Sequence, residues 1–69
     1  MITYDPLWET MKSKGVSTYR LVTYFNFSRG TLDKLKHNRN VTTETIGRLC
    51  TILDCSVPEV MQYLPDTTE

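Results

Sequence analysis

Residues that begin helices recur at short intervals along the chain, and this spacing constrains the fold more than any other feature. Ser, Thr and Asp side chains cap the free amide groups of a helix, and Pro fits its first turn. Helices as short as these intervals allow are stable only when they pack against one another. The sequence therefore predicts an all-α fold, a compact five-helix bundle. The predicted starts are Asp5 followed by Pro6, Ser17, Ser28, Thr42 and Ser56.

Apolar residues at helical spacing indicate where the helices run. The clearest case is the fourth helix, where apolar residues follow the i, i+3, i+4, i+7 pattern from Ile46 to Leu53. Gly15 and Asn26 tolerate the left-handed backbone that ends a helix. The predicted helices are residues 6–14, 18–25, 29–36, a fourth that follows the cap at Thr42 and includes the apolar residues as far as Leu53, and residues 57–63, with residues 2–4 as a short extended segment.

The last helix and the core follow from the same patterns. Ser56 and Glu59 have the spacing of a capping box that starts the last helix, and Pro65 ends it. The inward faces of the helices define the core. The predicted core residues are Leu7, Trp8, Met11, Val16, Leu21, Val22, Phe25, Leu32, Leu35, Ile46, Leu49, Cys50 and Leu53.

The length of 69 residues allows one domain, and we expect residues 1–69 to form it. Hydrophobic residues make up 39% of the chain, which is too much for a disordered tail. No apolar run approaches the roughly 20 residues of a membrane-spanning helix, and the N-terminus lacks the features of a signal peptide. We therefore expect a cytoplasmic protein with no membrane partner.

Candidate catalytic and metal-binding residues are few. Cys50 and Cys55 do not have the spacing of a redox or zinc motif, and His37 is the only histidine. The sequence contains no glycine-rich phosphate loop and no nucleophile–base set. We therefore expect two reduced thiols, no metal or other cofactor, no small-molecule ligand and no enzymatic activity.

The charges are polarised along the chain, although the total net charge is zero. The span from Lys12 to Arg48 contains all eight basic residues but only two acidic residues, a net charge of +6. The two flanks contain six acidic residues and no basic residue, a net charge of −6. A basic middle segment favours an anionic partner. The basic residues are Lys12, Lys14, Arg20, Arg29, Lys34, Lys36, Arg39 and Arg48.

Residues 17–36 have the pattern of a helix-turn-helix motif. The predicted helices 18–25 and 29–36 are joined by a turn at residues 26–28. In such a motif the second helix enters the major groove of double-stranded DNA, while the first lies across the backbone. The pattern thus predicts a DNA-binding protein with residues 29–36 as its recognition helix.

Four segments of the sequence resemble the Cro/C1-type (XRE-like) helix-turn-helix regulators, and the similarity covers residues 4–64. Small bacterial or phage-like regulators of mobile-element and antibiotic-resistance operons, including the VanU type, are similar over almost the entire chain. Asn26 stands where the family usually has Gly, and Val22 stands where it commonly has a small residue. The resemblance implies a lambda-repressor-like domain that binds operator or promoter DNA and regulates transcription. The four segments are residues 4–8, 27–32, 40–46 and 49–55.

The resemblance implies that the start and outward face of the second motif helix read the bases. Arg29 fits this role best, because a guanidinium binds O6 and N7 of guanine together. Lys34 reaches either guanine or phosphate. Asp33 either accepts a hydrogen bond from cytosine N4 or pairs with His37 one turn later. Gly30 has no side chain and lets the backbone approach the duplex closely.

The resemblance also implies contacts with the DNA backbone at the start of the first motif helix and in the loop after the second. A helix N-terminus offers free amide groups and hydroxyls to phosphate, and Ser17 is expected to cap its helix as well. Lys14 and Lys36 are either further contacts or solvated charges. The predicted backbone-contacting residues are Ser17, Thr18, Ser28, Thr31, His37, Asn38 and Arg39.

A protein-interaction module without DNA binding is the alternative function, because the acidic, apolar C-terminal end suits a protein partner. A single helix-turn-helix reads few base pairs, so a DNA-binding chain of this size is expected to act as a homodimer, at least on DNA. The predicted dimer surface either joins two copies or merely closes the core of one. It consists of Val57, Val60, Met61, Tyr63 and Leu64, joined by Ile2 and Tyr4.

Overall fold

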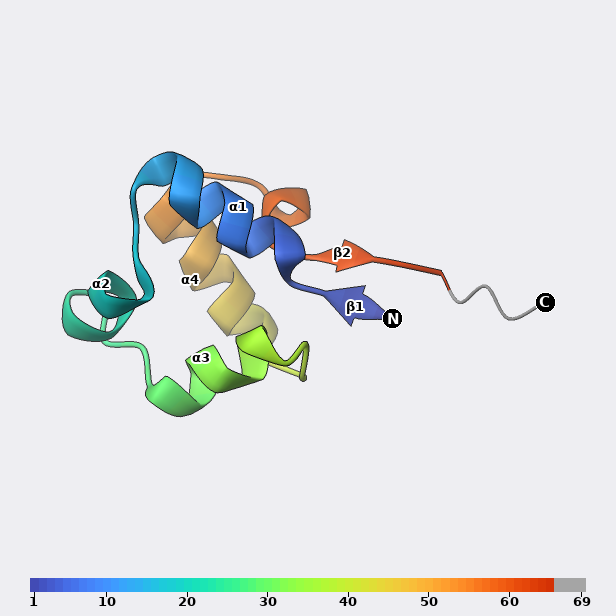
Figure 1. Ribbon diagram of the computed structural model, residues 1–69, viewed down its shortest axis with the longest axis horizontal. Coiled ribbons are helices and arrows are strands. Elements are labelled where there is room, and N and C mark those ends of the chain that lie inside the picture. The colour runs from blue at the N-terminus through green and yellow to red at the C-terminus, as the bar shows by residue number, and fades with distance from the viewer. Residues whose placement is uncertain (66–69) are drawn as a thin grey trace.

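The computed structural model of the chain describes residues 1–65 and consists of four α-helices, a short 3-10 helix and a two-stranded ribbon (Figure 1). In chain order these are β1 (Ile2–Thr3), α1 (Asp5–Lys14), α2 (Thr18–Thr23), α3 (Arg29–Lys36), α4 (Thr43–Leu53), the 3-10 helix η1 (Val57–Glu59) and β2 (Gln62–Tyr63). Helix α1 packs across α4, and the ribbon lies at the end of the molecule away from α2. Within residues 1–65, no helix has the length and apolar character needed to span a membrane.

Three of the predicted helix starts are confirmed. Ser17, Ser28 and Thr42 have extended backbone, and each hydroxyl accepts a hydrogen bond from the backbone N–H three residues later, at 3.0–3.2 Å. The predicted cap at Asp5 is wrong, because Asp5 is itself the first residue of α1. Its N–H donates instead to Oγ1 of Thr3 at 3.2 Å, so the buried Thr3 hydroxyl satisfies the start of this helix.

Residues with left-handed backbone close the helix ends. Gly15, which the sequence predicts in this role, has a φ angle of 71°. Asn26 has the predicted left-handed backbone, with φ of 63°, but it lies in the turn after α2, which already ends at Thr23. Asn38 and Asp54 adopt the same conformation without having been predicted to do so. At Gly15, Asn38 and Asp54, two backbone hydrogen bonds run back across the last helical turn in the Schellman pattern. Local backbone bonds therefore satisfy the last carbonyl groups of these three helices.

Helix α2 is shorter than the predicted residues 18–25, and this changes which aromatic side chain enters the core. The helix ends at Thr23, and the N–H of Phe27 returns to the carbonyl of Leu21 at 2.9 Å. Phe27 is therefore buried, whereas Phe25, a predicted core residue, is 36% exposed. The prediction for Phe25 is wrong because it assumed that the helix continues to residue 25. Phe25 would lie on the same helix face as Leu21 only in that case.

The predicted fifth helix, residues 57–63, is wrong in its extent: the capping box of Ser56 and Glu59 is present and the helix starts at Val57 as predicted, but it ends at Glu59. A single 3-10 turn, η1, is followed by strand β2, which pairs antiparallel with β1 so that Ile2 lies opposite Tyr63. The predicted extended segment at residues 2–4 is confirmed for Ile2–Thr3. Strand β2 forms by pairing with β1, which lies near the N-terminus. Local spacing in the sequence does not reveal a contact between such distant segments.

The core is close to the one predicted, with three additions. Tyr4, Phe27 and Val60 are buried although they were not predicted as core. The predicted residues Trp8, Val16, Val22 and Cys50 are partly buried and pack against the core. The buried hydrophobic residues are Tyr4, Leu7, Met11, Leu21, Phe27, Leu32, Leu35, Ile46, Leu49, Leu53 and Val60.

Candidate nucleic-acid interface

The turn between α2 and α3 holds the two helices of the predicted motif in place. Asn26 supplies the left-handed corner, and the ring of Phe27 joins the core behind it. The guanidinium of Arg48, from α4, lies 4.3 Å from the centroid of the Phe27 ring and donates a hydrogen bond to the carbonyl of Phe25. A cation–π contact and a hydrogen bond therefore fasten the turn to α4.

Helix α3 has one buried face and one exposed face, as its spacing predicts. Leu32 and Leu35 are buried and fix the helix on the body of the protein. The opposite side presents polar and charged residues to solvent, which leaves it available to a ligand. The four residues predicted to contact bases all lie there: Arg29, Gly30, Asp33 and Lys34 are exposed.

A cleft of about 340 Å³ opens between α2 and α3. It brings together Thr18, Arg29 and Asp33, which were predicted separately as backbone and base contacts. Lys36, which the sequence left open, lines the same cleft. Residues from both motif helices thus share one recess beside the exposed face of α3.

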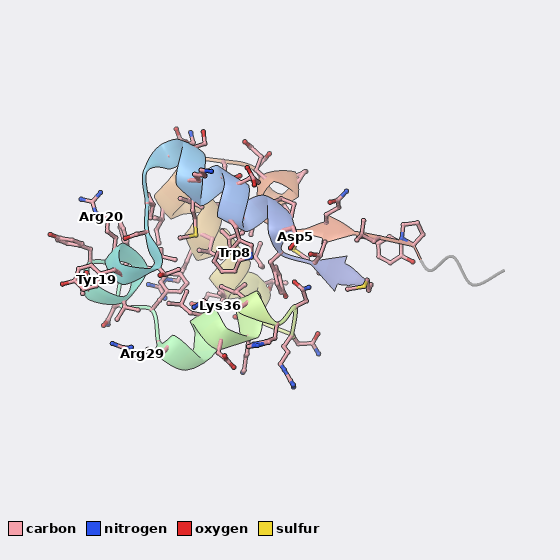
Figure 2. All side chains as sticks on the ribbon, viewed as in Figure 1. Asp5, Trp8, Tyr19, Arg20, Arg29 and Lys36 are labelled. Carbon is pink, nitrogen blue, oxygen red and sulfur yellow. The ribbon has the colours of Figure 1, made fainter. Side chains whose placement is uncertain are left out.

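Tyr19 is a candidate contact that sequence reasoning missed. It lies in the first turn of α2, is 72% exposed and lines the cleft with Arg29. Figure 2 shows both side chains at the same end of the molecule. A phenol offers a hydrogen-bond donor and a ring that can pack against sugar or base. The available signal was an aromatic residue that follows Thr18 and lies off the apolar stripe of α2.

Asp33 is engaged within its own helix. Its carboxylate lies 3.3 Å from Nδ1 of His37, and the same nitrogen is 2.9 Å from the Asp33 carbonyl oxygen. Both side chains are more than 60% exposed, so solvent and ligands reach the pair. Of the two alternatives for Asp33, the pair with His37 is the arrangement observed in this structure.

The loop after α3 is anchored by the N-terminal segment. Oδ1 of Asn38 accepts a hydrogen bond from the N–H of Tyr4 at 3.0 Å, and the carbonyl of Arg39 accepts one from the Tyr4 hydroxyl at 2.9 Å. Asn38 therefore has a structural task in addition to any DNA contact. The side chain of Arg39 is exposed and makes no hydrogen bond or ion pair within residues 1–65.

The hydroxyl groups at the two motif helix starts are already engaged. The Ser28 hydroxyl accepts from the N–H of Thr31 at 3.0 Å and donates to Oγ1 of Thr31 at 2.9 Å. The Ser17 hydroxyl accepts from the N–H of Arg20 at 3.2 Å. A phosphate at these helix starts would therefore accept hydrogen bonds from the remaining free backbone N–H groups, because the serine hydroxyls are already hydrogen-bonded.

The electrostatic character of the surface matches the polarised sequence. All eight basic residues are exposed, and within residues 1–65 none of them forms an ion pair with a carboxylate. Their charges are thus open to an anionic ligand. No group of three or more His, Cys, Asp or Glu side chains in the described part of the chain is placed to hold a metal ion.

Two short helices joined by a tight left-handed turn, the second presenting a polar face, define a helix-turn-helix protein. The chain belongs to the family of Cro/C1-type helix-turn-helix DNA-binding domains, whose sequence model matches residues 6–66. It is similar to the crystal structure of the transcriptional regulator VanUg, with a TM-score of 0.84 and 25% sequence identity over 94% of this chain and 87% of that one. This neighbour agrees with the resemblance to the VanU type. No curated protein shows significant similarity to the chain.

Proposed function

We propose that the chain is a transcriptional regulator that binds double-stranded DNA sequence-specifically, with α3 in the major groove. The observation that carries the proposal is the exposed face of α3, which presents Arg29 and Lys34 next to the cleft shared with α2. The VanUg neighbour, itself described as a transcriptional regulator, supports it. A helix lying in the groove with its first residues on the bases is the docking mode of this motif.

The proposed base contacts centre on Arg29, whose guanidinium forms a fork to O6 and N7 of guanine. Lys34 reaches guanine or phosphate one turn later. At Gly30 a Cβ would meet only Oγ of Ser28, at 3.9 Å, so packing within the protein does not require glycine there. We assign Gly30 to close approach of the DNA. Asp33 contacts cytosine only after its pair with His37 has opened.

The proposed phosphate contacts flank α3 on both sides. The start of α2 and the start of α3 offer backbone N–H groups, and the loop after α3 offers the exposed guanidinium of Arg39. Tyr19 and Lys36 join this set because they line the cleft with Arg29. The remaining proposed contacts are Ser17, Thr18, Ser28, Thr31, His37 and Asn38.

The test compares Arg29→Ala and Arg39→Ala on selected and scrambled duplexes over a range of salt concentrations. The DNA would first be defined by selection from a random pool. Arg29→Ala should weaken binding to the selected site by about 1–3 kcal/mol and relax selectivity. Arg39→Ala should weaken binding to all sequences alike and flatten the salt dependence.

Lys12→Ala, which removes one positive charge from α1, is the matched control. Unchanged DNA binding by both arginine variants would contradict the proposed interface. Failure of the wild-type chain to bind any duplex would favour the protein-interaction module.

We further propose that two copies bind one site as a homodimer through the terminal ribbon. Tyr4 and Val60 cannot contribute to this surface, because they are buried in the core of one copy. Ile2, Tyr63 and Leu64 remain exposed, and the two-stranded ribbon of the described residues leaves an outer edge of each strand unpaired. Through Tyr4 the ribbon is joined to the loop after α3.

A dyad through this ribbon would pair two half-sites about 34 Å apart. The measurement is the footprint length on DNA, together with light scattering of the free protein. Tyr63→Glu should shorten the footprint to one half-site, because a charge on the ribbon opposes its association with a second copy. A wild-type footprint of one half-site would contradict the dimer.

A further inference from the structure

The end of α4 brings the two cysteines of the chain together. Asp54 has a left-handed backbone with φ of 51°, and the N–H of Cys55 donates to the carbonyl of Cys50 at 3.0 Å. A second bond runs from the N–H of Asp54 to the carbonyl of Thr51 at 3.4 Å. These two bonds form a Schellman motif, in which the first and last side chains come into contact. Here the first and last residues of the motif are Cys50 and Cys55, which places their side chains next to each other.

Both sulfur atoms are free thiols and partly accessible. The Cys50 thiol is one of the groups that act on the pKa of the Cys55 thiol, so the two side chains lie close together. Burial, followed by the neighbouring Cys50 and Glu59, raises the pKa of the Cys55 thiol, while Lys14 opposes this effect. Because the thiolate is the nucleophile in thiol oxidation, this shift slows attack by the Cys55 sulfur without preventing it.

We propose that Cys50 and Cys55 form a dithiol site that a two-electron oxidant of the peroxide class converts into an internal disulfide. One thiol, as its thiolate, attacks a peroxide oxygen, which gives a sulfenic acid and releases water. The second sulfur attacks the sulfenic sulfur, so the S–S bond forms and a second water leaves. Both sulfur atoms are oxidised and the peroxide is reduced, and two thiols plus one peroxide yield one disulfide and two water molecules.

Little backbone movement is needed for this reaction. A disulfide requires two Cα atoms within about 7 Å, and the 3.0 Å hydrogen bond from the Cys55 N–H to the Cys50 carbonyl already brings the two backbones together. The turn from residue 50 to residue 55 is thus closed before oxidation. A disulfide would make this closure covalent and prevent fraying of the end of α4, which packs against α1 and η1.

The site lies away from the proposed DNA interface. Figure 1 shows α4 running from its start near α3 to its end beneath the C-terminal part of α1. Oxidation at Cys50 and Cys55 therefore changes the stability of the fold and leaves the exposed face of α3 unaltered. This separation makes the inference testable without reference to DNA binding.

The experiment treats the full reduced chain with hydrogen peroxide, blocks the remaining thiols with iodoacetamide and measures the intact mass. The expected product is a single chain that is lighter by two hydrogen atoms, carries no alkyl group and returns to the dithiol with dithiothreitol. Its thermal midpoint should exceed that of the reduced chain by at least about 5 °C. Cys50→Ser and Cys55→Ser are the matched controls, which cannot form this product.

Four results would overturn the proposal. The first is a chain with both thiols still open to alkylation after oxidation. The second is a disulfide between two chains, and the third is a stable sulfenic or sulfinic acid at one cysteine. An internal disulfide that lowers the thermal midpoint would also contradict it, because the turn would then be strained by the bond.

Discussion

The two ends of this molecule are held by interactions of different range. At the helix-turn-helix end, residues 17–36, the backbone bonds and helix caps join residues at most six positions apart, and one longer-range hydrogen bond joins Arg48 to the carbonyl of Phe25. At the terminal end, β1 pairs with β2, and Tyr4 bonds to residues 34 and 35 positions away. The hydroxyl of Thr10 reaches the carbonyl of Glu59, 49 positions along the chain.

We therefore expect DNA recognition and the stability of the fold to depend on different residues. The side chains on the outer face of α3 carry little of the fold, because local backbone bonds and two buried leucines already position the helix. Changes there should alter DNA binding with small effects on stability. At the terminal end the side chains themselves connect distant segments, so changes there should destabilise the whole domain.

The sharpest comparison replaces a tyrosine by alanine at each end. Tyr4 is 4% exposed and hydrogen-bonded at its hydroxyl, so Tyr4→Ala should cost about 3–5 kcal/mol of unfolding free energy. Tyr19 is 72% exposed, so Tyr19→Ala should change stability by no more than about 0.5 kcal/mol while weakening DNA binding. Urea denaturation and DNA titration of both variants measure the two effects. Equal loss of stability would refute the proposed division.

Asn38 connects the two ends of the molecule through its hydrogen bond to Tyr4, and substitutions of Asn38 test this connection. Its left-handed φ of 56° and its bond to the N–H of Tyr4 both favour asparagine. Asn38→Ala should cost about 1–3 kcal/mol, because it strains the backbone and leaves that N–H without its partner. Asn38→Gly relieves the strain and should cost less. The exposed Asn40→Ala is the control, and thermal denaturation that ranks glycine below alanine would show the strain to be absent.

The helix-turn-helix end could be predicted from the sequence because its determinants are mostly local. Ser17, Ser28 and Asn26 act at or within three residues of their own positions, and the structure shows each in the predicted place. The exposed face of α3 followed from helical periodicity alone. Phe25 is the exception, since the helix ends before it and Phe27 fills the core in its place.

The terminal end could not be predicted in the same way. Ser56 and Pro58 indicate the start of a helix correctly, but nothing near them shows that the chain leaves the helix to pair with Ile2. For Tyr4 and Val60 the sequence left open whether they join two copies or close the core of one, because their partners lie far along the chain. Tyr19 was missed for a different reason, because its place in the cleft depends on how α2 and α3 pack.

Substitutions at two glycines also distinguish DNA recognition from stability, and their expected effects are smaller. A Cβ at Gly30 would touch only Ser28, and at Gly47, on the exposed side of α4, it would touch nothing within 4 Å. Both Gly30→Ala and Gly47→Ala should stabilise the fold by about 0.5–1 kcal/mol through helix propensity. Only Gly30→Ala should weaken DNA binding, because its methyl group would stand between α3 and the duplex. Equal DNA affinity of the two variants would remove Gly30 from the interface.

The smallest expected effect concerns the pH dependence of the turn at η1. Oε1 of Glu59 accepts hydrogen bonds from the N–H and the hydroxyl of Ser56, at 3.0 and 3.1 Å, and these bonds lower the pKa of Glu59 below its ordinary value of 4.5. The unfolded chain therefore binds the proton first as the pH falls. The carboxylate stabilises the fold fully above the unfolded pKa, and this contribution is lost as the pH falls through the folded pKa.

Glu59→Gln should accordingly lower the thermal midpoint slightly near about pH 6, and the difference from wild type should shrink as the pH falls to about 3. Glu9→Gln, on the exposed face of α1, is the control for removing one negative charge. A difference that grows on acidification would reverse the sign of the argument and show that the charged carboxylate opposes the turn. Because Glu59 is exposed and its bonds are local, the effect should remain smaller than that of any substitution at Tyr4.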